Sequence, residues 1–136
     1  MTRHRWRVLE AAIALVLARA LLRVLPFARV AQLAGGVDTV LPSDEPGRRT
    51  TEPQALAVGR AIGAASRRLP GRSTCLVRAL AGRLMLARRR IPSGLVLGVG
   101  STDRAIHAHA WLVAGGGTVC GGREAPAFRP IAAFRS

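Results

Sequence analysis

The hydrophobic pattern of this chain changes its period once, near Pro92. Before that point, Ala- and Leu-rich segments end at Pro or Gly, and Leu76, Leu80 and Leu84 recur at helical spacing. After it, short apolar runs alternate with small or polar residues and are separated by glycines, which is typical of antiparallel strands. Helices followed by strands predict an α+β fold, with N-terminal helices ahead of a small antiparallel sheet.

Pro, Gly and capping residues set the expected element limits. Thr51 is expected to cap the second helix, and Ser73 or Thr74 the third. Residues 37–52 are rich in Asp, Glu, Pro, Gly and Thr and are expected to form a loop. The expected helices cover 6–25, 52–69 and 75–90, and the expected strands cover 95–99, 106–114 and 118–120. At 136 residues we expect one compact domain, with a helical segment and loop at 1–52 and a core at 53–136.

The chain has a net charge of +14, and all of its basic residues are Arg. Two interpretations stay open: a surface for an anionic partner, or a GC-rich coding sequence that favours Arg, Ala, Gly and Leu together. The arginines are scattered, and neither a nucleic-acid motif nor aromatic stacking groups accompany them, so we expect no nucleic-acid partner. No signal-peptide pattern is present, which favours the cytoplasm, where both cysteines stay free.

An apolar stretch near the N-terminus raises the question of a membrane. Only eight uncharged residues separate Glu10 from Arg19, whereas a spanning helix needs roughly 20. A buried or partner-facing helix is therefore expected. Basic residues flank the stretch, so a weak association with a membrane surface stays open.

Cys75 stands at the predicted start of a helix, where unpaired amides and the helix dipole stabilise a thiolate. His107, His109 and Trp111 alternate with small residues on a predicted strand and therefore share one face. A Cys–His pair could thus form, with the imidazole activating the thiol. Alternatively the cysteine is an inert core residue and the histidines are surface groups. A zinc site made by Cys75, Cys120, His107 and His109 matches no common ligand spacing, and we expect no metal.

Several strings, in this order, resemble the leader peptidases of lasso-peptide biosynthesis. These are transglutaminase-like proteins similar to the C-terminal domain of the microcin-processing B protein. The similarity extends over residues 65–134. The strings are Ser-Thr-Cys-Leu-Val-Arg-Ala-Leu at 73–80, Arg-Arg-Arg-Ile-Pro-Ser-Gly-Leu-Val-Leu-Gly-Val at 88–99, Ala-His-Ala-Trp-Leu at 108–112, Val-Cys-Gly-Gly at 119–122 and Phe-Arg-Pro-Ile at 128–131.

The resemblance implies a papain-like, transglutaminase-like core that acts as a cysteine peptidase without a cofactor. It implies that Cys75 is the nucleophile and His109 the general base. The implied substrate is a ribosomally made lasso-peptide precursor, from which the leader is removed. The implied partners are that precursor, a separate leader-binding protein and a lasso cyclase.

The sequence departs from the family pattern at one position. The family commonly has an Asp about a dozen residues after the histidine, where Gly121 and Gly122 stand here. Glu124 is the nearest substitute for orienting the imidazole of His109. The missing Asp also motivates an alternative, a catalytically impaired module that binds a peptide or a partner protein.

Three further residues near this constellation have expected roles. His107 either contacts substrate in the pocket or faces solvent at the strand edge, and we favour the second. Trp111 is expected to pack beside His109 and shield the Cys–His pair from water, although a contact with substrate stays open. Cys120 is expected to be structural.

Overall fold

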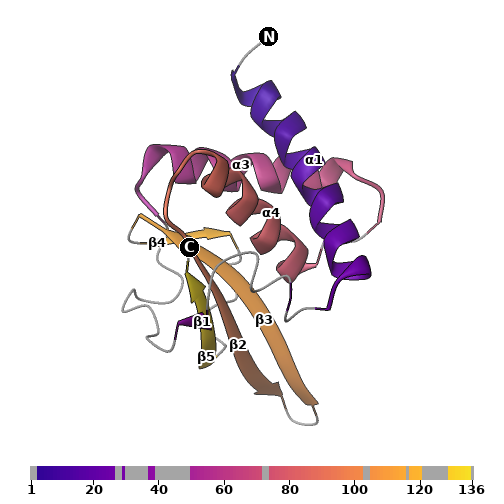
Figure 1. Ribbon diagram of the computed structural model, residues 1–136, viewed down its shortest axis with the longest axis vertical. Coiled ribbons are helices and arrows are strands. Elements are labelled where there is room, and N and C mark those ends of the chain that lie inside the picture. The colour runs from indigo at the N-terminus through magenta and orange to yellow at the C-terminus, as the bar shows by residue number, and fades with distance from the viewer. Residues whose placement is uncertain are drawn as a thin grey trace.

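The computed structural model describes residues 3–26, 29, 37–38, 50–71, 74–102, 105–115, 117–120 and 129–135. Within these residues, the second and third of three helices lie on one face of a five-stranded antiparallel sheet, and the first helix packs against both of them (Figure 1). The helices are α1 (Arg3–Val24), α3 (Pro53–Arg68) and α4 (Cys75–Arg88). The strands are β1 (Val37–Asp38), β2 (Gly94–Thr102), β3 (Ala105–Ala114), β4 (Gly117–Cys120) and β5 (Arg129–Arg135). The α+β prediction is confirmed.

The sheet contains two strands that the sequence did not predict, β1 and β5. The strand order is β1-β5-β2-β3-β4, so the C-terminal β5 lies between β1 and β2. Val37 pairs with Phe134 and Asp38 with Ala133. The prediction of a loop beginning at residue 37 was therefore wrong for β1, because pairing with a distant strand extends this short segment. Most of the rest of the predicted loop, residues 39–49, lies outside the described residues.

The N-terminus of α3 is capped by Glu52 and not by Thr51, which corrects the sequence prediction. Glu52 has an extended backbone, with φ −69° and ψ 122°, and its carboxylate accepts a hydrogen bond from the Ala55 N–H. Pro53 follows as the first helical residue, where its missing N–H costs nothing. The Thr50 hydroxyl accepts a hydrogen bond from the Glu52 N–H at 3.2 Å and holds the cap in place.

Close approaches at glycine fix the helical layer against the sheet. A Cβ on Gly82 of α4 would lie 2.7 Å from Cδ2 of Leu112 on β3. A Cβ on Gly59 of α3 would fall on the carbonyl oxygen of Val119 on β4, closer than the 3.0 Å that real Cβ atoms keep. Helices α3 and α4 therefore lie directly on β4 and β3, and this contact positions the start of α4.

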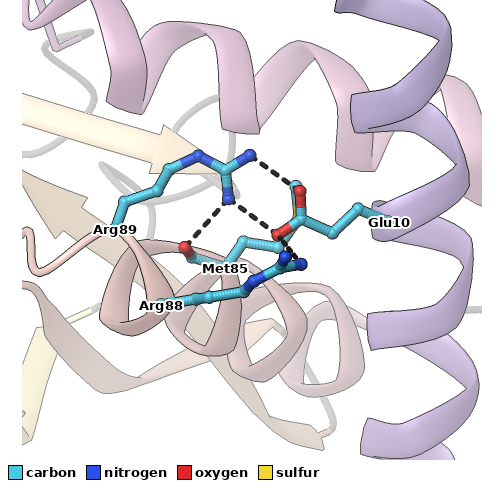
Figure 2. A network of polar contacts seen from close by, with 4 residues as sticks. All are labelled: Glu10, Met85, Arg88 and Arg89. Carbon is cyan, nitrogen blue, oxygen red and sulfur yellow. Dashed lines mark hydrogen bonds and ion pairs between the residues drawn. The ribbon is translucent and has the colours of Figure 1, made fainter.

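One ion-pair network joins α1 to the C-terminal end of α4 (Figure 2). The Arg89 guanidinium donates to both carboxylate oxygens of Glu10, at 2.8 and 2.7 Å, and also to the Met85 carbonyl at 3.1 Å. Arg88 lies 3.3 Å from the same carboxylate. The hydrogen bond from Arg89, and then the positive charges of Arg89 and Arg88, lower the pKa of Glu10 against the opposing effect of burial.

Candidate active site

The helix start predicted to carry the nucleophile is present. Cys75 is the first residue of α4, and Thr74 caps the helix with its hydroxyl accepting from the Val77 N–H at 3.2 Å. The Arg78 N–H donates to the Thr74 carbonyl at 3.0 Å. Cys75 is a half-buried free thiol that packs against the main core. The other residue expected as a cap, Ser73, lies outside the described residues.

The side chains of His109 and Trp111 are brought together on β3. Their rings stack with centroids 5.9 Å apart and planes 25° apart. Trp111 is 2% exposed and His109 8% exposed, so the indole packs beside the imidazole as predicted, whereas Cys75 does not belong to the cluster of Trp111. His107 lies in the exposed outer part of the strand, which agrees with its favoured position facing solvent.

The faces of β3 do not bring His109 to Cys75. Ala110 and Leu112 contact the main core beneath the helices, and Cys75 packs against that same core. Trp111, with His109 stacked on it, belongs to a second apolar cluster formed with Val96. Because successive residues of a strand point to opposite faces, the thiol and the imidazole occupy opposite faces of the sheet.

The second cysteine, Cys120, also lies on the helical face. Its Sγ lies 3.8 Å from the position that a Cβ on Gly82 would take, two turns along α4 from Cys75. Burial raises the pKa of Cys120 to about 12, against the opposing effects of the Arg78 charge and of a backbone hydrogen bond from Leu112. Cys120 is thus held as a neutral thiol, as a structural role requires.

Arg78 is a charged residue of the candidate site that no sequence motif marked. Its charge acts on Cys120, and it follows Cys75 by three residues, a spacing that places the two on neighbouring positions of a helix surface. That i, i+3 relation was readable in the sequence once the helix was predicted. The guanidinium supplies positive charge that acts on the thiol of Cys120.

The remaining predicted site residues are placed as follows. Glu124, Gly121 and Gly122 lie outside the described residues. No group of three or more His, Cys, Asp or Glu side chains that could hold a metal ion occurs within the described ranges.

Comparison with known proteins identifies one family. The model of the transglutaminase-like superfamily matches residues 12–133, which is most of the chain and includes α1 from its third turn onward. Neither curated proteins nor solved structures gave a significant match.

Proposed function

The chain belongs to the transglutaminase-like superfamily, and we propose that it is a cysteine peptidase that removes the leader from a ribosomally synthesised lasso-peptide precursor. Cys75 is the nucleophile in this proposal. Its sulfur attacks the scissile carbonyl carbon, the C–N bond breaks, and the resulting thioester is hydrolysed to release the acyl half. The resemblance of the strings around Cys75 and His109 to lasso leader peptidases supports this choice of substrate.

The observation that carries the proposal is the position of Cys75 at the capped N-terminus of α4. Thr74 engages two of the first amides, those of Val77 and Arg78. The oxyanion donors that the mechanism needs are the amides of Cys75 and Leu76, which lie at the positive end of the helix dipole. A half-buried thiol at such a point combines access for a peptide with stabilisation of developing negative charge.

His109 is the proposed general base, and the structure attaches a requirement to that role. The imidazole must reach the helical face of the sheet, which it does not face in the described arrangement. We propose that the imidazole and the thiol approach each other when the precursor and the leader-binding protein are bound, with Glu124 orienting the ring.

The position of His109 also favours a second candidate function. A transglutaminase-like module whose imidazole stays beside Trp111 would lack a base for Cys75 and would bind the precursor or a partner without cutting it. The two candidates differ in what Cys75 and His109 contribute: both are needed for cleavage, and neither is needed for binding alone.

Cleavage and binding of the precursor should be measured separately, with the leader-binding protein present. In the peptidase, Cys75→Ala and His109→Ala lose cleavage but keep binding measured by fluorescence anisotropy. The matched controls Cys120→Ala and His107→Ala keep both activities. If Cys75→Ala still cleaves the precursor, the peptidase proposal is wrong. If His109→Ala still cleaves it, His109 is not the general base. Binding without cleavage by the wild-type protein establishes the second candidate.

The proposal extends to partners and compartment. A separate leader-binding protein delivers the precursor, a lasso cyclase uses the released core peptide, and the reaction takes place in the cytoplasm. Glu124→Gln should lower the cleavage rate without affecting binding of the precursor. An unchanged rate shows that this carboxylate does not orient His109.

A further inference from the structure

Helix α1 is apolar on two opposite faces, and only one of them is covered. The covered face packs against α3 and α4. Its buried residues are Val8, Ala11, Ala14, Leu15 and Ala18. The open face carries six large apolar side chains that are between 49% and 79% exposed. We name them the α1 stripe: Trp6, Leu9, Ile13, Val16, Leu17 and Val24.

The α1 stripe forms a continuous line, because its members follow one another at intervals of one, three, four or seven residues along one side of the helix. A shallow hollow lies beside its middle and has an entirely apolar lining. That lining is formed by Ala12, Ile13, Val16, Leu17, Ala20 and Leu69. In Figure 1, α1 lies at the outer side of the helical layer and its N-terminal end projects beyond the other helices. Such a contiguous apolar surface marks a docking site.

Positive charge borders the α1 stripe. Arg5 and Arg68 line a neighbouring hollow that includes Leu9. Arg88, with a side chain 75% exposed, lines another that includes Ile13 and Leu17. Two further exposed arginines, Arg3 and Arg23, lie near the two ends of the helix.

The one acid of α1 offsets only part of this charge. Glu10 pairs with both Arg89 and Arg88 across the junction with α4, and the three side chains together keep one positive charge. The rim of the stripe is therefore net positive.

We propose that the α1 stripe docks this protein on the surface of an anionic lipid bilayer, with α1 lying in the plane of the interface. An apolar line with Trp, Leu and Ile, bordered by Arg, is the pattern of an in-plane membrane helix. The apolar side chains enter the boundary of the acyl chains while the arginines meet phosphate and carboxylate headgroups. Among the described residues, no helix has the length and hydropathy needed to cross a bilayer, which agrees with a helix that lies on it.

The positive charge around the α1 stripe favours an anionic bilayer over a second copy of the chain as its occupant. A second copy would bring two identical positive rims together, each on a chain of net charge +14, and like charges face each other across a two-fold interface. An anionic bilayer complements both the apolar line and its rim. A protein partner such as the leader-binding protein is an alternative that the experiment separates from a membrane.

Vesicle binding of the full chain tests the proposal through Trp6. The chain has two tryptophans, and Trp111 is buried whereas Trp6 is 59% exposed, so a change in emission on binding reports α1. Vesicles of phosphatidylglycerol and phosphatidylcholine should sediment the protein and shift the emission to shorter wavelength. Pure phosphatidylcholine vesicles should bind it at least about tenfold more weakly, because each Arg at an anionic surface contributes about 1 kcal/mol.

Matched variants separate the α1 stripe from the rest of the surface. Ile13→Gln with Leu17→Gln alters only exposed side chains and should weaken binding to the anionic vesicles by at least about tenfold. The control Ile106→Gln changes a still more exposed apolar residue on β3, 80% exposed, and should bind like the wild type. Circular dichroism verifies that each variant is folded.

Three results overturn the proposal. The first is no binding to the anionic vesicles, and the second is equal binding by the double variant and the control. The third is an α1-stripe-dependent dimer, or an α1-stripe-dependent complex with the leader-binding protein, in the absence of vesicle binding. The inference does not rest on the proposed peptidase activity, since Cys75→Ala should bind vesicles as the wild type does.

Discussion

Replacing Gly59 by alanine should destabilise the fold, although the same change improves helix propensity. The added Cβ would overlap the carbonyl oxygen of Val119, and a backbone atom cannot rotate away as a side chain can. Relief therefore requires α3 or β4 to move. Overpacking of this kind costs about 1–3 kcal/mol, and the immovable obstacle places it in the upper part of that range. Subtracting the gain of about 1 kcal/mol for Ala over Gly leaves a loss of about 1–2 kcal/mol.

Gly63 provides the matched control in the same helix. A Cβ there would lie 3.6 Å from an Arg67 guanidinium nitrogen, which is an ordinary contact. Gly63→Ala should therefore stabilise the fold by about 0.5–1 kcal/mol through helix propensity alone. The two variants make the same chemical change and should move the free energy of unfolding in opposite directions.

Urea unfolding followed by far-ultraviolet circular dichroism measures both values. The m-values should match that of the wild type, so that a shift in midpoint reports stability. If Gly59→Ala is as stable as Gly63→Ala, then α3 does not lie directly on the backbone of β4, and the positioning of the helical layer derived from these glycines is wrong.

Three further predictions follow from the cap, the ion pair and the buried thiol. Thr74→Ala should cost about 1 kcal/mol of unfolding free energy by removing the cap of α4, whereas Thr74→Ser should retain it; equal losses in urea titrations would show that the hydroxyl does not cap. Glu10→Gln should cost about 1–2 kcal/mol at pH 7, because it removes a bidentate charge-assisted pair. Since the folded pKa of Glu10 is lowered, this contribution is complete above its ordinary value of 4.5 and disappears as pH falls through the lowered one; a Gln variant with an unchanged acid-unfolding curve contradicts the network. The Cys120 thiol, with its pKa raised to about 12, should resist iodoacetamide in the native protein while Cys75 is labelled, and mass spectrometry of the labelled peptides checks this. Because the folded pKa of Cys120 is the raised one, its contribution to stability is complete below the ordinary thiol value and is lost as pH rises toward 12; a Cys120→Ala variant with the same alkaline unfolding curve would refute it.

Local signals predicted the helices well, and the structure shows why they did. Pro26 follows the end of α1, Pro53 begins α3, and Thr74 caps α4. Each of these residues acts on its own neighbours, so no tertiary information is needed. The cap of α3 went to Glu52, whose carboxylate accepts from the Ala55 N–H while the Thr50 hydroxyl accepts from the Glu52 backbone N–H.

Strands that depend on distant partners escaped sequence analysis. β1 contains only Val37 and Asp38, and β5 has a proline, Pro130, as its second residue, so neither has the local signature of a strand. Their pairing with each other, between segments far apart in the sequence, is what defines them. Long-range pairing of this kind leaves no period in the sequence.

The sequence predicted which element carries each candidate site residue, but not which of these residues lie together in space. Alternation correctly placed His109 and Trp111 on one face of β3. It could not decide which face meets α4, because the inner half of the strand is apolar on both sides: Ala110 and Leu112 on one, Trp111 and Val113 on the other. Arg83 is another residue whose burial could not be predicted, since nothing in the sequence marked this arginine of α4 as buried.

The clamp between Glu10 and Arg89 makes α4 a lever. The helix has 14 residues, and at 1.5 Å per residue the arm from the clamped end to the thiol of Cys75 is about 20 Å, so that tilting it by roughly 5° displaces the sulfur by about 2 Å. Whatever displaces α1 also displaces the carboxylate of Glu10 and with it the clamped end of α4. The position of the nucleophile therefore depends on how α1 is seated, at the opposite end of the helix that carries Cys75.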